Sequence, residues 1–193
     1  MSELSFELQR TGSTNRINLR DQVFTWSGTV GSLGAVEVAY PTERADYRGL
    51  HFRASVTGQY LPATSYFGRE YAGRPSLAEG ELSVAGNPAS LSRNAWGLTR
   101  RGRALRIAAE GREYVYAEHR NRRGHELRRS GAGVRMTRSH WKNPQTISGI
   151  CQGAADGLDI SLAILLESVY TRNLSVRGAL VSAPGRVLSR LSE

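Results

Sequence analysis

The stretch LDISLAILLESVYTRNL, residues 158–174, is the longest apolar run in this chain of 193 residues. Projected at about 100° per residue, its apolar side chains cover nearly the whole circumference of a helix, interrupted by Ser161, Glu167 and Ser168. A helix that is apolar on all sides is buried in a protein core or in a membrane. A membrane span needs about 20 apolar residues. This run is shorter and carries Asp159 and Glu167, so the sequence predicts a core helix and no transmembrane span.

Both ends of this helix carry charges that suit its dipole. Asp156 or Asp159 is placed to accept hydrogen bonds from the first backbone amides, and Arg172 suits the opposite end. Beyond it, residues 175–193 read as a tail with a short amphipathic helix, broken at the Pro-Gly pair 184–185. We therefore expect a single domain over residues 1–174, with its central helix at 158–174, and a tail over 175–193.

The chain before the helix reads as short strands separated by turns. In residues 49–57 apolar and polar side chains alternate strictly, and residues 103–138 form a succession of alternating hairpins. One apolar and one polar face per strand is typical of an antiparallel sheet. We predict a mainly β fold with a buried C-terminal helix: an antiparallel barrel of about ten to twelve strands wrapped around that helix.

Basic residues are concentrated in one part of the chain. The formal charge is +9, and residues 93–142 hold fourteen basic residues against four glutamates. Such a surface favours an anionic partner, although a solvated face that binds nothing is the alternative. We predict an anion-binding face on the outside of the hairpins. Its members are Arg101, Arg103, Arg106, Arg112, Arg120, Arg122, Arg123, Arg128, Arg129, Arg135 and Arg138.

No hydrophobic period holds in residues 58–80, which mix aromatic side chains with glycine and proline. Long irregular loops in compact domains are usually functional, and aromatic residues are enriched at protein interfaces. One interpretation is a surface loop that packs its aromatics against the sheet. The other is a partner-binding or self-association loop formed by Tyr60, Tyr66, Phe67 and Tyr71.

Motifs of enzyme chemistry and cofactor binding are absent from the sequence. There is no C-x-x-C pair, H-E-x-x-H, calcium loop, G-x-S-x-G elbow or P-loop, so we expect a non-enzyme with no metal and no cofactor. The glycines at 28, 31 and 34 are followed by strand-like AVEVAY, which favours a hairpin turn over a phosphate loop. The single cysteine, Cys151, is predicted to be buried and unreactive.

The arginine-rich hairpins of Gly102–Tyr170 end in ADGLDISLAILLESVY, residues 155–170. This pattern resembles the tubby C-terminal-like superfamily, which includes the LURP-one-related and phospholipid-scramblase-like proteins. The resemblance implies a closed β-barrel that encloses the last helix. No motif matches the lipid-binding residues of the family, so none of them is carried over.

These observations favour a non-catalytic binding or scaffold protein whose basic hairpin face engages anionic phospholipid headgroups or an acidic protein. The N-terminus lacks a signal pattern, so we expect a cytoplasmic protein, peripheral at the inner membrane surface if it binds lipid. Two alternatives stay open. The same face can bind nucleic acid, with Tyr114, Tyr116 and Trp141 for stacking. The chain can also be a structural subunit or homo-oligomer that assembles through residues 58–80 and the tail.

Overall fold

The structure, a computed structural model, describes residues 4–12, 25–40, 42–46, 49–71, 74–77, 80–93, 104–118, 123–141 and 144–169. Side chains are not described for residues 42–46, 49, 50 and 71. The predicted tail at 175–193 and the last residues of the predicted helix, 170–174, lie outside these ranges.

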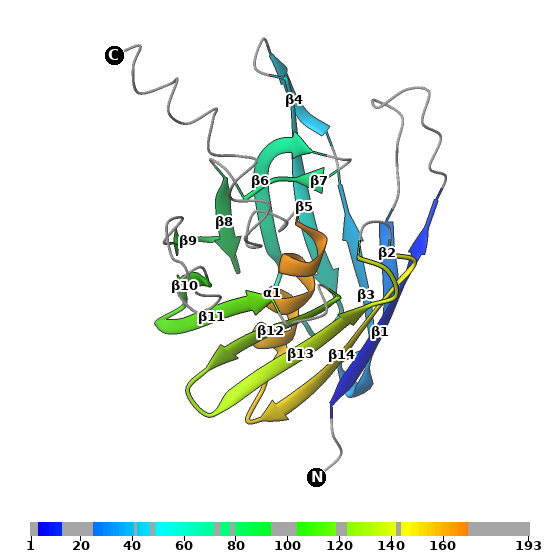
Figure 1. Cartoon of the computed structure of the whole chain (residues 1–193), viewed down its shortest axis with the longest axis vertical. Coiled ribbons are helices and arrows are strands. Elements are labelled where there is room, and N and C mark those ends of the chain that lie inside the picture. Colours follow the sequence, from blue (N-terminus) through cyan, green and yellow to red (C-terminus); the bar gives the residue numbers. More distant parts are fainter. Residues whose placement is uncertain are drawn as a thin grey trace.

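Strands dominate the described part of the chain (Figure 1). They are β1 (Ser5–Thr11), β2 (Thr25–Val30), β3 (Ala35–Ala39), β4 (Thr42–Asp46), β5 (Gly49–Gly58), β6 (Thr64–Tyr71), β7 (Arg74–Pro75), β8 (Glu81–Val84), β9 (Asn87–Ser92), β10 (Leu105–Ala109), β11 (Arg112–Glu118), β12 (Gly124–Arg129), β13 (Ala132–Arg138) and β14 (Thr146–Gly153). A 3-10 turn, η2 (Gly31–Leu33), joins β2 to β3, and the helix α1 (Gly157–Ser168) follows β14.

Twelve of these strands form a closed antiparallel barrel. Their order is β5-β3-β2-β1-β14-β13-β12-β11-β10-β9-β8-β6, and β6 pairs back with β5 to complete the ring. The two remaining strands are additions, because β4 pairs with the end of β5 and β7 pairs with the end of β6. A closed ring leaves no unpaired edge between neighbouring barrel strands.

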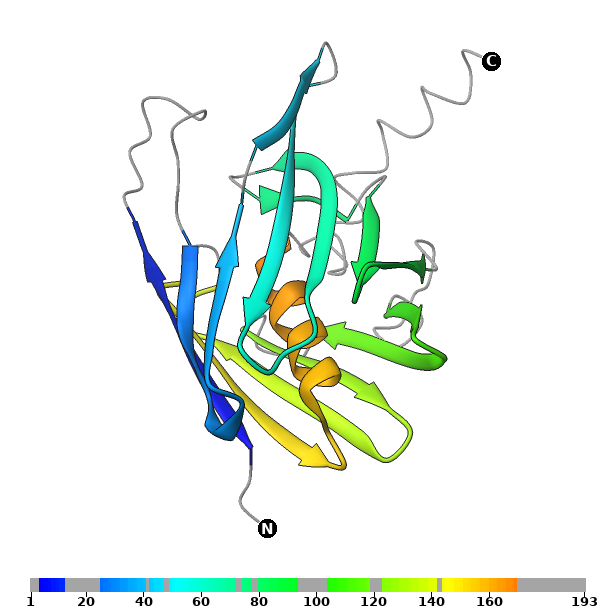
Figure 2. The same cartoon turned by 180° about the vertical axis from the view of Figure 1, so that it is seen from behind.

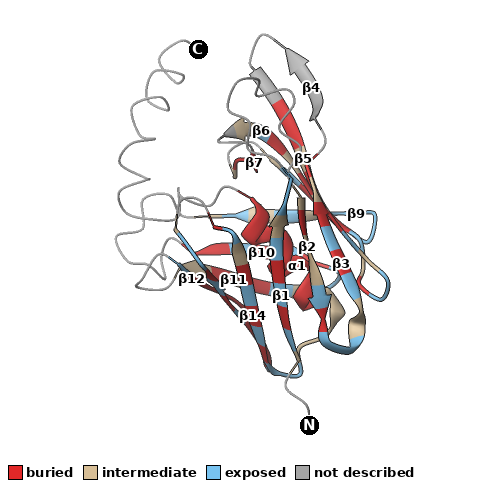
Figure 3. Ribbon diagram, turned by 90° about the vertical axis from the view of Figure 1, so that its right-hand side faces the viewer, coloured by how far each residue is buried: buried red, intermediate tan, exposed pale blue. Residues whose placement is uncertain are grey.

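Alternation along the strands gives the barrel a dry inside and a wet outside (Figure 3). In β13, Val134 and Met136 are buried while Arg135 and Thr137 are exposed. The register keeps the two faces separate across the sheet, since Val134 pairs with Leu127 on one side and Cys151 on the other, all of them buried. The predicted burial of Cys151 is confirmed.

The helix α1 lies inside the barrel, as predicted (Figures 1 and 2). It packs on β5 and β6 at one side and on β12 and β13 at the other. Its residues from Ile160 to Ser168 are fully buried, so no solvent-facing stripe exists. Each leucine or isoleucine buried in this way contributes about 1.5–3 kcal/mol to stability.

The polar side chains of the helix are all satisfied by the barrel wall or by the helix itself. Ser161 Oγ donates to Pro62 O at 2.7 Å and lies 2.9 Å from Thr64 Oγ1, while Ser168 Oγ donates to Ile164 O at 2.8 Å. Buried hydroxyl groups without partners would cost free energy, so these contacts explain why serines are tolerated in the core.

The predicted loop over residues 58–80 is wrong in large part, because Thr64–Tyr71 is the barrel strand β6. Tyr66 is a core residue with no exposed surface, whereas Tyr60 is 63% exposed at a turn. The pattern is irregular because glycines accommodate Tyr66. A Cβ at Gly80 would lie 2.0 Å from the Tyr66 hydroxyl. The side chain of Tyr71 lies outside the described set.

The barrel has two unlike ends, which we name after the helix. At the helix-start end, where α1 begins, strands are joined by short described connections at residues 31–34, 59–63, 85–86, 110–111, 130–131 and 154–156, none of which contains arginine or lysine. At the helix-exit end, where α1 stops, the segments between barrel strands are longer in sequence: residues 12–24, 40–48 with β4, 72–80 with β7, 93–104, 119–123 and 139–145. The structure describes part of each.

Candidate functional site

The structure divides the predicted anion-binding arginines into three groups. Arg106, Arg128 and Arg135 lie on the outer face of strands, and Arg123 is exposed just before β12, at the helix-exit end. Arg112, Arg129 and Arg138 belong to inward-facing positions and contact α1, so the prediction that these three line the outer face is wrong. Arg101, Arg103, Arg120 and Arg122 lie outside the described residues.

The outer strand face carries less free positive charge than the sequence suggested. Glu126 lies between two of its arginines, 3.2 Å from Arg128 and 3.7 Å from Arg135. Glu110 and Glu113 are exposed on the same hairpins. Exposed ion pairs contribute little to stability, but they do neutralise the surface potential of strands β10–β13.

Two arginines hold the first turn of the helix. Asp156 and Asp159 form a capping box, in which each carboxylate accepts a backbone amide of the other residue. Arg129 donates two hydrogen bonds of 2.8 Å to Asp159, and Arg112 donates one of 2.7 Å to Asp156. The Tyr114 hydroxyl adds a bond of 3.1 Å to Asp159. The prediction that Asp156 or Asp159 caps the helix is confirmed for both.

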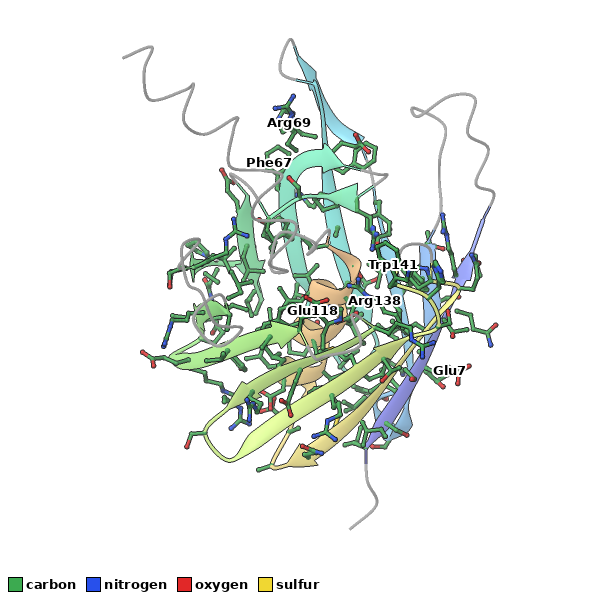
Figure 4. All side chains as sticks on the ribbon, in the orientation of Figure 1. Glu7, Phe67, Arg69, Glu118, Arg138 and Trp141 are labelled. Atoms are coloured by element: carbon green, nitrogen blue, oxygen red, sulfur yellow. The ribbon has the colours of Figure 1, made fainter. Side chains whose placement is uncertain are left out.

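A second cluster surrounds Glu167, the penultimate residue of α1, and includes Arg138, which is labelled in Figure 4. The Arg138 guanidinium donates at 2.5 Å to the Glu167 carboxylate and at 2.9 Å to its backbone carbonyl. Tyr116 donates to the same carboxylate at 2.8 Å, and His125 Nδ1 lies 3.0 Å from it. Glu167 is 0% exposed and Arg138 is 5% exposed, so this ion pair is shielded from water.

Electrostatics keep Glu167 ionised despite its burial. Burial alone would raise the pKa of this carboxyl, but the nearby Arg138 and then His125 lower the pKa to about 2. A buried ion pair of this kind contributes little net free energy when intact, but is costly to break. The cluster therefore fixes the position of the helix in the barrel rather than presenting a reactive group to a substrate.

Tyr40 and three arginines complete the helix-exit end. The Tyr40 hydroxyl donates to Ser168 O at 3.2 Å and accepts from the Trp26 indole at 3.0 Å. Burial raises the pKa of Tyr40, and the charges of Arg74 and Arg138 act on it in the opposite direction. Arg10 also interacts electrostatically with Tyr40.

The helix is shorter than predicted, since it ends at Ser168 and Val169 is extended. Its last carbonyls are bonded by side chains from the barrel: Glu167 O by Arg138 and Ser168 O by Tyr40. Arg172, which was predicted to suit this end of the helix, lies outside the described residues.

Strand parity is the signal that would have identified the inward arginines. Arg138 has the same parity as Val134 and Met136, and Arg112 shares the parity of Tyr114 and Tyr116. Side chains two residues apart in a strand point to the same face, so these arginines must turn inward. The acid in the middle of an apolar helix, Glu167, also requires a buried cation.

The described residues present no obvious reactive centre. No group of three His, Cys, Asp or Glu side chains among them is arranged to hold a metal ion. Cys151 is buried near the helix-start end of β14, whereas His140 is exposed beyond the opposite end of β13, so the two do not form a dyad. Among the described residues, no helix is both long enough and apolar enough to cross a membrane.

Comparison with known proteins gives no relative: no protein family, no curated protein and no solved structure matches this chain.

Proposed function

We propose that this chain is a non-catalytic binding or scaffold protein that engages an anionic partner through the helix-exit end of its barrel. The partner class is anionic phospholipid headgroups or an acidic protein surface. The cytoplasmic location and the peripheral membrane association that follow from it are part of the same proposal, as is kinship with the tubby-like proteins, which the enclosed C-terminal helix supports.

The observation that carries this proposal is the asymmetry of the barrel ends. The described connections at the helix-start end lack arginine and lysine, and the described arginines Arg93 and Arg123 lie at the helix-exit end. In the sequence, the segments that contain these two arginines also hold Arg100, Arg101 and Arg103, and Arg120 and Arg122, and a third segment holds Lys142. A concentration of basic residues of this kind favours an anionic partner. The outer face of β10–β13 contributes less to this attraction, because its glutamates partly neutralise its arginines.

The alternatives lose part of their support. Nucleic-acid binding relied on stacking by Tyr114, Tyr116 and Trp141; the two tyrosines are buried against α1, and Trp141 alone is partly exposed. Assembly through residues 58–80 relied on a loop that is largely a barrel strand, with Tyr66 in the core. We therefore prefer an anionic lipid surface or an acidic protein to nucleic acid as the partner.

A vesicle sedimentation experiment with matched triple variants tests the proposal. We expect the protein to sediment with vesicles that contain phosphatidylserine and not with pure phosphatidylcholine, and to dissociate as salt rises. Replacing Arg120, Arg122 and Arg123 by glutamine should weaken binding by about 100-fold, because each basic residue near such a surface contributes about 1 kcal/mol.

The control variant replaces the strand-face arginines Arg106, Arg128 and Arg135 by glutamine, which removes the same charge from another surface. We expect this variant to keep most of its vesicle binding. Equal losses in both variants would show that only the net charge matters, and absence of binding to anionic vesicles would eliminate the lipid proposal.

A further inference from the structure

The segment that joins β13 to β14 carries a tryptophan at the helix-exit end. Trp141 lies just past the end of β13 and is partly exposed (Figure 4). His140 beside it is exposed, and the centres of the two rings lie 6.2 Å apart. The segment therefore presents an aromatic side chain to solvent at the end of the barrel to which the proposed function assigns the partner.

Hydrogen bonds hold the base of this segment in place. The Ser139 hydroxyl accepts from the backbone amides of Gln145 and Thr146, at 2.9 and 3.0 Å. The Ser139 amide donates to Thr146 O at 3.0 Å, so the two ends of the segment are tied together. A side chain that is presented from a fixed segment loses less conformational entropy when it binds than one on a loose chain.

Basic residues accompany Trp141 both in space and in sequence. The guanidinium of Arg123 donates to Ser139 O at 3.4 Å, which places an exposed cation against the same segment. Lys142 follows Trp141 in the sequence. Tryptophan combines an apolar ring with one polar N–H, and it is enriched at the boundary between lipid headgroups and acyl chains.

We propose that Trp141 anchors the protein in the headgroup region of an anionic membrane. This inference rests on the proposed function and narrows its partner to a lipid surface. A shallow aromatic anchor combined with basic residues is sufficient for peripheral membrane binding.

An acidic protein partner would require a larger apolar contact, because protein interfaces have a desolvated core of hydrophobic and aromatic side chains. The exposed large hydrophobic residues in the described part of the chain are Tyr60 and Ile150. Tyr60 belongs to a connection at the helix-start end, and Ile150 lies on the outer face of β14. Neither is placed to form such a core at the helix-exit end.

Quenching of tryptophan fluorescence by brominated phosphatidylcholine, in vesicles that also contain phosphatidylserine, tests the depth of Trp141. Of the other two tryptophans, Trp26 is buried and Trp96 lies outside the described residues, so the experiment uses the full chain with Trp96→Phe. We expect these vesicles to quench its emission. The quenching should disappear when Trp141→Phe is added, because Trp26 stays inside the barrel.

The matched variants Trp141→Ala and Tyr60→Ala compare aromatic side chains at opposite ends of the barrel. Trp141→Ala should weaken binding to phosphatidylserine vesicles about tenfold, because it removes apolar area that the membrane buries. The salt dependence of binding should stay the same, since the basic residues remain. Tyr60→Ala removes a side chain that is 63% exposed and should bind like the natural sequence. If Trp141→Ala does not fold, the phenylalanine variants decide alone.

Sedimentation with the same vesicles separates this inference from the proposed function. Binding without quenching of Trp141 overturns the anchor and leaves the lipid proposal standing. An undiminished affinity of folded Trp141→Ala, or an equal loss in Tyr60→Ala, overturns the anchor in the same way. If the natural sequence does not sediment with anionic vesicles, the lipid proposal is wrong and the anchor is wrong with it.

Discussion

Glu167 is the residue on which the placement of the helix depends most. It is a fully buried acid in the last turn of α1, held by Arg138 from β13 and Tyr116 from β11. A hydrophobic residue would fill the same space without any desolvation cost. The acid therefore serves to fix the position of the helix rather than to add net stability. It accepts bonds only when the helix has the correct rotation and depth in the barrel.

Replacing Glu167 by glutamine should destabilise the protein by about 3–5 kcal/mol at pH 7, because it leaves the buried Arg138 without its counter-charge. Chemical denaturation at constant temperature measures this change. The double variant Glu167→Gln with Arg138→Met should recover part of the loss, since no buried charge remains. A loss below about 1 kcal/mol in the single variant would contradict the account of the pair.

The same pair predicts a dependence of stability on pH. The pKa of Glu167 in the folded protein, about 2, lies below its ordinary value of 4.5, so its contribution to stability is complete above about pH 4.5 and is lost as the pH falls toward 2. Over that interval the natural sequence should lose roughly 3 kcal/mol from this group. The glutamine variant should lose correspondingly less, and equally steep curves for both proteins would refute the assignment.

At the residue scale, the sequence showed which residues are distinctive but not whether their side chains face the inside or the outside of the barrel. It identified the arginines as the distinctive residues and placed them all outside. Three of them point inward: Arg112, Arg129 and Arg138. The sequence predicts this only if the alternation of side chains along the strand is given more weight than the general preference of arginine for water. That preference is outweighed here because acids on the helix provide partners inside the barrel.

At the scale of elements, the helix is the feature that the sequence predicted best. Its apolar circumference indicated burial on all sides, and the acids at 156 and 159 indicated its first turn. Its end was predicted too late, since the apolar pattern continues through Val169. The stop depends on Arg138 and Tyr40, which are distant in sequence, so no local signal could reveal it.

Introducing a charge into this helix should abolish folding. Leu165→Asp buries a carboxylate where no cation is available, so we expect no soluble folded protein, judged by yield and by the absence of a melting transition. The matched control is Ile150→Asp on the outer face of β14, where the side chain is 47% exposed. It should fold normally. A normal melting transition for Leu165→Asp would contradict the buried position of α1.

Strand β6 shows why one barrel element was missed. Its sequence TSYFGREY lacks an unbroken apolar alternation, because Gly68 occupies an inward position beside the ring of Tyr66. A large aromatic and its neighbouring glycines together fill the space of two ordinary side chains. The composition resembles a loop, although the backbone pairs with β5 and β8 along its length.

At the scale of the whole molecule, the barrel and the helix form one cooperative unit. The helix is connected to the last strand by the short turn 154–156 and is surrounded by the wall. It cannot leave without separation of paired strands. The pairing of β1 with β14 joins the first and last strands of the barrel, which are far apart in sequence.

Hydrogen exchange should reveal this cooperativity. We expect the backbone amides of α1 and of β13 to exchange with the free energy of global unfolding, while those of the additional strand β4 exchange faster. Mass spectrometry of peptides from exchanged protein can measure both. Exchange of α1 at a lower free energy than β13 would show that the helix opens independently, in contradiction to its enclosure.

The barrel with its enclosed helix could be predicted from the sequence because two local patterns, the alternating strands and the apolar helix, each constrain the whole fold. Many alternating strands require closure to hide their edges, and an apolar helix such as Leu158–Val169 requires a surrounding wall. The difference in basic residues between the two ends of the barrel could not be predicted from the sequence. It depends on which strand ends meet, and therefore on the pairing of β1 with β14 and of β3 with β5.

The position of the helix after β14 has a consequence for biosynthesis. Translation proceeds from the N-terminus, so every wall strand is made before the segment that fills the interior. Before β14 is made, β1 lacks one of its two neighbours, and until α1 follows, the apolar inner sides of the strands have no helix to cover them. The nascent chain is thus obliged to remain unassembled or chaperone-bound until its final core segment emerges, and a ribosome stalled before residue 157 would release an aggregation-prone product.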